Sequence, residues 1–236
     1  GCWVRAGVAT LVVGSAKGGL PLIGTLAVPL MALQISPVVA AGLLLPIYII
    51  SDMYGLWIYR KSFDRRNIAI LVPAAAIGII FGWATASVTN EDVVTILVGL
   101  IGLAYCIDAF LKARRNLPPR SADVPRGIFW GAIAGFTSFV SHSGAPPYQM
   151  YVLPQRLEKM VYAGTSTIVF AIINLLKLPP YWFLGQVNLG SLEIAAMLTP
   201  LALAGAYLGF RLTKILPEKL FFRLVEQADV VMENMS

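Results

Sequence analysis

The chain is 236 residues long, and 58% of its residues are hydrophobic while only 13% are charged. Soluble domains carry about twice that charged fraction, and a fold of this size has too much surface to hide such an apolar surplus from water. The composition therefore excludes a water-soluble protein and predicts an integral membrane protein. The formal net charge is +6, but the basic residues cluster between apolar spans, which indicates cytoplasmic loops and no nucleic-acid partner.

The cysteines and the N-terminal sequence narrow the possibilities further. Cys2 and Cys106 lie far apart and form no CxxC motif, so a disulfide framework and a thiolate metal site are both disfavoured. We expect no cofactor and no metal. Residues 1–13 are already apolar and lack the charged region and cleavage site of a signal peptide. Because no initiator methionine is present, we expect a truncated or lightly trimmed N-terminus.

The apolar spans predict the fold class. A bilayer core of ~30 Å requires about 20 apolar residues per helix. Five segments meet this requirement, and the sequence therefore predicts an all-α, polytopic integral membrane protein. In chain order the predicted transmembrane helices are 38–59, 68–87, 93–111, 162–182 and 191–213.

Two further apolar regions, 1–34 and 127–156, are interrupted near their middle. The first carries KGGLP at 17–21, and the second carries SHSGAPP at 141–147. Glycine and proline together lower helix propensity and remove a backbone donor, and each remaining arm is too short to cross the roughly 30 Å core comfortably. We expect both regions to be helical hairpins that enter the membrane, turn and leave on the same side.

The sequence also repeats itself. Pro21 and Pro29 are eight residues apart, as are Pro146 and Pro154. We expect a first repeat over 1–111, a cytoplasmic basic linker over 112–126, and a second repeat over 127–236 with an incomplete C-terminal segment. Each repeat would hold one hairpin and three crossings, an odd number, so the second repeat must be inverted. Inverted repeats with broken helices that meet at the midplane are typical of secondary transporters.

The interrupted tips contain the candidate binding residues. At an offset of 125, Lys17 aligns with His142, the only histidine. A basic residue beside small residues with bare amides suits a small anion, although snorkelling of the lysine and a structural hydrogen bond of the histidine are the plain alternatives. The predicted substrate-binding residues are Ser15, Lys17, Gly18, Gly19, Ser141, His142, Ser143, Gly144 and Gln149, with helix packing an equal alternative for Gln149.

Asp52 is the second candidate for chemistry within the membrane. It aligns with Asn174 at an offset of 122, so one repeat has an acid where the other has an amide. A buried carboxylate can exchange a proton during transport, and we assign proton coupling to Asp52 and His142. Pairing with Lys177 or Lys17, or a purely structural hydrogen bond, would also explain the acid.

Three other functions remain open at this point. Ser141 and His142 could belong to an intramembrane enzyme, but no GxSxG motif or paired acid accompanies them. A permease for a small carboxylate and a passive membrane scaffold are the others. The sequence around Lys17 lacks the GxxxxGK[ST] spacing of a phosphate-binding loop.

The duplicated tips resemble a known family. GGLP at 18–21 with VPL at 28–30, echoed by SGAPP at 143–147 with LP at 153–154, is similar to the TauE/SafE sulfite exporters, and FWGAIAGFTSF at 129–139 resembles one bacterial branch of them. The resemblance implies a multi-pass permease of the bacterial inner membrane that moves sulfite, organosulfonates or related sulfur anions, usually outward and with protons. Lys17, His142 and Ser143 replace tip glycines of the family, and the polar stretch 226–236 replaces a last apolar helix, from which we expect a shortened or altered C-terminus.

Overall fold

The computed structural model describes residues 37–86 and 118–233, together with Thr10, Ile96, Leu100 and Leu103, and its side chains over 39–86 and 118–225. The described chain is helical, and four of its helices are long and apolar enough to cross a membrane. The predicted all-α membrane fold is therefore confirmed. The predicted hairpin 1–34 and helix 93–111 lie outside the described residues. The long helices are α3 (Pro37–Tyr59), α4 (Arg65–Thr85), α8 (Lys159–Phe183) and α9 (Leu189–Ile215).

Helices α4 and α9 begin before their predicted spans because polar caps lie outside the apolar run, and α4 ends at Thr85, two residues before its predicted end. The Asp64 side chain accepts from the Asn67 amide at 2.7 Å and starts α4. Asn188 and Ser191 form a reciprocal capping box at the start of α9. Such caps satisfy amides that have no intrahelical acceptor, so the helices continue into the interface beyond the apolar residues.

The interrupted region 127–156 is folded as two helices that pack against each other. These are α6 (Val124–Ser141) and α7 (Ala145–Val152), followed by the short 3₁₀ helix η2 (Leu153–Gln155). The Arg120 amide donates to the Pro154 carbonyl at 2.9 Å, and the Tyr151 hydroxyl donates to the Asp123 carbonyl at 3.0 Å. Both ends of the hairpin therefore lie on the same side. Helix α6 begins within the predicted linker because Asp123 caps it and a proline occupies its first turn.

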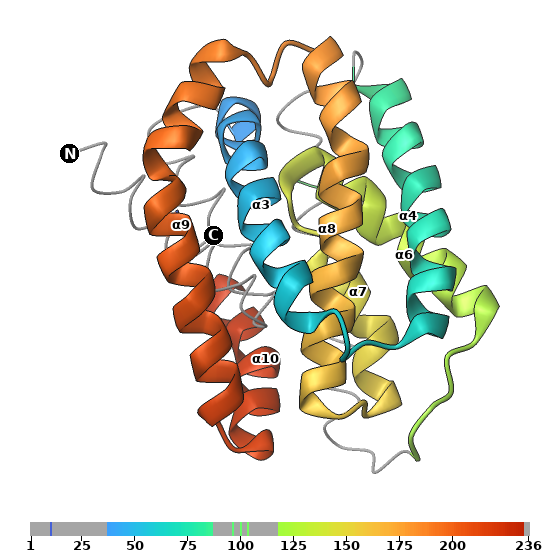
Figure 1. Ribbon diagram of the computed structural model, residues 1–236. Helices are drawn as coiled ribbons and strands as arrows, with labels where there is room; N and C mark the ends of the chain where they lie inside the picture. Colours follow the sequence, from blue (N-terminus) through green and yellow to red (C-terminus); the bar gives the residue numbers. More distant parts are fainter. Residues whose placement is uncertain are drawn as a thin grey trace.

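Helices α3 and α8 form the centre of the bundle, with α9 beside α3 and α4 beside α8 (Figure 1). Two glycines allow the central pair to approach closely. A Cβ on Gly42 would lie 2.1 Å from the Gln186 carbonyl oxygen, and one on Gly164 would lie 1.7 Å from the Ser62 carbonyl oxygen. Each glycine near the start of one helix thus packs against the loop that ends the other, so α3 and α8 are antiparallel.

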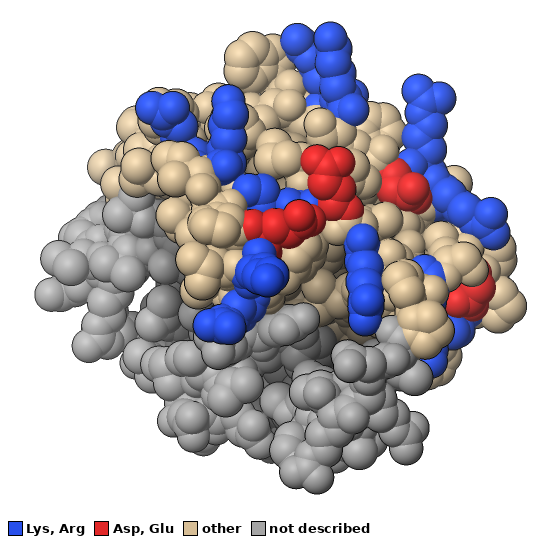
Figure 2. Space-filling view, turned by 90° about the horizontal axis from the view of Figure 1, so that it is seen from below, with Lys and Arg blue, Asp and Glu red and all other residues tan. Residues whose placement is uncertain are grey.

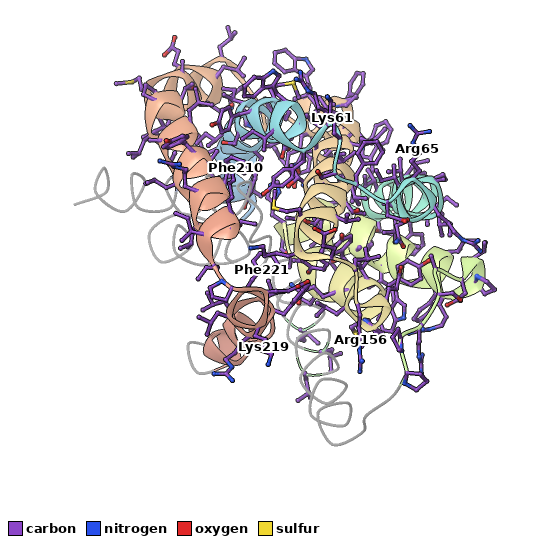
Figure 3. All side chains as sticks on the ribbon, turned by 60° about the horizontal axis from the view of Figure 1, so that its bottom comes forward. Lys61, Arg65, Arg156, Phe210, Lys219 and Phe221 are labelled. Atoms are coloured by element: carbon purple, nitrogen blue, oxygen red, sulfur yellow. The ribbon has the colours of Figure 1, made fainter. Side chains whose placement is uncertain are left out.

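Charged side chains gather at one end of the bundle. Figure 2 shows this end, where Lys and Arg side chains surround a smaller acidic group, and Figure 3 labels Lys61, Arg65, Arg156 and Lys219 from four different segments there. The loop 184–188 at the opposite end has no charged residue. An excess of basic residues in short loops marks the cytoplasmic side. The sides of the bundle expose apolar residues suited to lipid, among them Trp57, Ile80, Phe81, Phe129, Met197 and Leu208.

The C-terminal helix α10 (Glu218–Glu233) follows Pro217. Phe221 is fully buried on the side of α10 that faces the bundle, where its ring lies 6.1 Å from that of Tyr162, while Lys219 is exposed (Figure 3). The main-chain amide of Lys159 and the Glu218 carboxylate are 3.4 Å apart. The end of α9 and the start of α10 are thus joined to the start of α8.

A buried amide pair fixes the hairpin to α4. The Asn67 side chain donates to Gln155 Oε1 at 2.8 Å, and the Gln155 side chain donates back to Asn67 Oδ1 at 3.0 Å. Gln155→Leu leaves the buried Asn67 amide without this partner, so we expect a loss of about 1–3 kcal/mol in unfolding free energy. Thermal unfolding in detergent measures it. Asn67→Leu/Gln155→Leu should recover part of the loss, and equal losses in the single and double variants would contradict the pairing.

Candidate functional site

The hairpin tip is a tight, buried turn. His142 ends α6 in the left-handed conformation, with φ 56° and ψ 17°, and Ser141, His142 and Ser143 are each less than a tenth exposed. The His142 amide donates to the Ser138 carbonyl at 3.1 Å, and the Ser143 amide donates to the Thr137 carbonyl at 3.3 Å. The Ser143 amide, which the sequence suggested would be bare, is therefore engaged in ending α6.

The amides beyond the turn are few. Helix α7 starts after Gly144, and its first residues are Ala145, Pro146 and Pro147. The first amides of a helix have no intrahelical acceptor, but the two prolines contribute none. This leaves the Gly144 and Ala145 amides as the donors that the helix start can offer. Gly144 is required here because a Cβ would lie 2.8 Å from the Ala134 carbonyl oxygen.

A buried lysine reaches the tip from α8. Lys177 is 0% exposed, and its ammonium nitrogen lies 2.8 Å from His142 Nδ1, 3.0 Å from the Ser138 carbonyl oxygen and 3.1 Å from Ser138 Oγ. An ammonium group has three N–H donors, so Lys177 can donate to each of these acceptors. The positive charge beside His142 thus comes from α8 of the same half of the chain.

The surroundings determine which nitrogen of His142 carries the hydrogen. Nε2 lies 3.1 Å from the Ala41 carbonyl oxygen, which can only accept, so Nε2 must donate. Nδ1 faces the Lys177 ammonium, which can only donate, so Nδ1 accepts. The geometry therefore assigns a neutral imidazole with the hydrogen on Nε2.

Aromatic rings enclose this pair. The Tyr48 ring stacks on His142 with centroids 4.8 Å apart, and the Tyr181 ring lies edge-on to it at 6.1 Å. The Tyr181 hydroxyl donates to the Phe139 carbonyl, and the Lys177 ammonium is 6.0 Å from the Tyr181 ring centroid. The rings keep the histidine and the lysine out of bulk solvent, where their interaction would be screened.

Asp52 contacts the residue with which it aligns in the repeat. The Asn174 side chain donates to Asp52 Oδ2 at 2.8 Å across the α3–α8 crossing, and both residues are at most 3% exposed. Asp52 lies roughly midway between Gly42 and Ser62, the two points of close contact with α8. Asn174 precedes Lys177 by one turn of the same helix, so the carboxylate and the ammonium belong to one buried polar region.

Some predicted site residues are thus brought together and others are not described. The tip consists of Ser141, His142, Ser143 and Gly144. Asp52 lies on α3, one turn after Tyr48, whose ring stacks on His142. Gln149 is fully buried on α7. Lys17, Ser15, Gly18 and Gly19 lie outside the described residues, and their role stays a prediction. Lys177 and Ser138 were not among the predicted site residues, although a lysine inside an apolar span was a usable signal. Within the described ranges no cluster of metal-ligating side chains occurs.

Exchanging the acid and the amide tests this contact. Asn174→Asp opposes two carboxylates, one of which must then stay protonated, and we expect the variant to unfold at lower temperature than the parent. Asp52→Asn/Asn174→Asp restores one acid and one amide, so its thermal stability should return toward the parent value. The measurement is thermal unfolding at neutral pH, and additive losses in the double variant would show that the two side chains do not interact.

The chain was compared with protein-family models, with curated proteins and with solved structures. The model described as sulfite exporter TauE/SafE matches residues 6–227, which is nearly the whole chain. No curated protein and no solved structure matches the chain.

Proposed function

Because this chain belongs to the TauE/SafE sulfite exporter family, a family of membrane permeases, we propose that it moves a small sulfur anion across the bacterial plasma membrane by secondary transport. Sulfite and organosulfonates are the proposed substrates. The observation that carries this proposal is the fully buried Lys177 ammonium at the tip of a broken hairpin.

Lys177 would carry its positive charge in a medium of low dielectric constant. An ammonium group within a bilayer is costly and is found mainly on ion or substrate pathways. Three acceptors that contact the Lys177 ammonium are neutral groups of the tip, and an anionic oxygen that reached the ammonium would be a stronger acceptor than these. The Ser141 and Ser143 hydroxyls donate to the Thr137 and Ser141 carbonyls. The Gly144 and Ala145 amides lie in the same turn and are donors of the kind that oxyanions require.

The central helices support an inverted repeat and transport by alternating access. Gly42 packs against Gln186, in the loop after α8. Under the repeat, the equivalent contact is that of Gly164 with the loop after α3, and Gly164 packs against Ser62 of that loop. The Asp52–Asn174 hydrogen bond joins two residues 122 positions apart, which is the offset of the repeat at this helix. A two-fold axis in the membrane plane would pass near this bond. We propose that one repeat rocks against the other about this crossing.

Flux of radiolabelled sulfite in proteoliposomes tests the function, with and without an imposed pH gradient. We expect sulfite flux that depends on the protein and responds to the gradient. If the folded, inserted protein is silent with sulfite, a panel of sulfonates, thiosulfate and small carboxylates follows. Flux of carboxylates alone would show that the substrates are carboxylates and not sulfur anions. Absence of flux for every compound of the panel would overturn the transporter proposal.

A further inference from the structure

We propose that anion binding at Lys177 and proton uptake by His142 Nδ1 are one coupled event, so that the site is loaded with one anion and one proton together. This inference rests on the proposed function and specifies how its site handles the proton. It follows from the directions of the hydrogen bonds around His142.

Nδ1 is the ring nitrogen of His142 that can take a proton. Nε2 already carries a hydrogen, which it donates to the Ala41 carbonyl. Nδ1 is the remaining basic position, and its lone pair accepts from the Lys177 ammonium. A proton can therefore enter only at Nδ1, and only when Lys177 withdraws its hydrogen from that lone pair.

An anion supplies the reason for that withdrawal. An anionic oxygen is a stronger acceptor for an ammonium than a neutral imidazole nitrogen, so the N–H now given to Nδ1 would turn to the anion. The exposed lone pair of Nδ1 would then face negative charge and be repelled. A proton taken from water converts Nδ1 into an N–H donor to the same anion, and the imidazolium retains its Nε2 bond to Ala41.

The charge balance of the buried region favours the same outcome. Among the described residues, Asp52, His142 and Lys177 are the acid and basic side chains that are buried. With Asp52 and Lys177 ionised and His142 neutral, the charges of these described side chains sum to zero. A monovalent anion alone would leave one negative charge in a medium that penalises net charge strongly, whereas an anion with one proton keeps the region neutral.

The other groups that face His142 are compatible with this exchange. Tyr48 on α3 stacks on the ring, Tyr181 on α8 lies edge-on to it, and Ser138 on α6 shares Lys177 with it. These phenols and this hydroxyl are neutral at physiological pH. Asp52 follows Tyr48 by one turn and is the acidic residue of α3.

The presence of a single histidine allows a direct test. We would label the full chain with ¹⁵N-histidine, reconstitute it in lipid nanodiscs, and record the two ring-nitrogen signals. The probe is methanesulfonate, which stays ionised over the pH range used, so any proton uptake belongs to the protein. Without the anion we expect a neutral ring with hydrogen on Nε2, and at saturation with methanesulfonate we expect both nitrogens to carry hydrogen.

The affinity for methanesulfonate, measured by calorimetry on the same sample, gives a second readout. One coupled proton predicts tighter binding at lower pH, approaching tenfold per pH unit where the empty ring is neutral. His142→Gln should bind methanesulfonate with little dependence on pH, and Lys177→Met should bind it roughly 10- to 150-fold more weakly.

Two outcomes would overturn the coupling while leaving the permease proposal intact. One is methanesulfonate binding that leaves the ring neutral, and the other is an imidazolium already present in the empty protein at neutral pH. If sulfite flux and methanesulfonate binding are both absent in folded protein, the proposed function fails together with the inference.

Discussion

Lys177→Met is expected to abolish sulfite flux in proteoliposomes while the protein still folds and inserts. Methionine has a similar length and is apolar, so it can occupy the space of the lysine side chain without its charge. A charge-assisted hydrogen bond contributes about 1.5–3 kcal/mol, so we expect a roughly 10- to 150-fold loss of anion affinity from that contact alone. Calorimetric binding of methanesulfonate measures this loss.

The matched control for this substitution is Lys219→Met. Lys219 is exposed at the charged end of the bundle, on α10 (Figure 3), so the same chemical change there should leave flux close to that of the parent. Size-exclusion profiles and thermal unfolding of both variants separate misfolding from loss of binding. Normal flux in folded Lys177→Met would remove Lys177 from the site.

Gly135→Ala is expected to cause a large loss of stability. Helices α4 and α6 pack at backbone distance, and a Cβ on Gly135 would lie 2.1 Å from the Ala75 carbonyl oxygen. Neither backbone can move without separating the two helices, and overpacking of this kind costs about 1–3 kcal/mol or more. We expect a lowered unfolding temperature and weakened expression of folded protein.

Gly82→Ala is the graded control for the same interface. The nearest atom to its new Cβ would be Phe139 Cδ1 at 2.7 Å, and an aromatic side chain can move where a backbone carbonyl cannot. Its unfolding temperature should therefore fall by less than that of Gly135→Ala. Equal effects at the two positions would show that the close α4–α6 approach does not limit stability.

Local sequence patterns were sufficient to predict several features of this fold. Runs of apolar residues predicted α3, α4, α8 and α9, since a bilayer imposes the length of a spanning helix. The proline and glycine cluster after Ser141 marked the turn between α6 and α7, because these residues end helices through their own backbone chemistry. The caps at Asp64 and Asn188 then extended helices beyond the apolar runs.

The candidate site was predictable only in part. His142 and Asp52 stood out as polar residues in apolar surroundings, and they occupy the buried polar region of the bundle. The sequence shows Lys177 as a lysine inside an apolar span, but it does not predict the contact with His142, because several buried acceptors were compatible with the lysine. The engagement of the Ser143 amide with Thr137 depends on the left-handed backbone at His142, which residue type alone does not specify.

The sequence by itself determined that this chain is a helical membrane protein, where its helices lie and where its second hairpin turns, because these depend on hydrophobicity and backbone propensity within short segments. The tertiary structure decided which helices became neighbours. It placed Lys177 of α8 against His142 of the tip, and Asn174 against Asp52 of α3. Such pairings depend on the crossing of helices distant in the chain and on backbone approach at Gly42 and Gly164, and no local pattern encodes them.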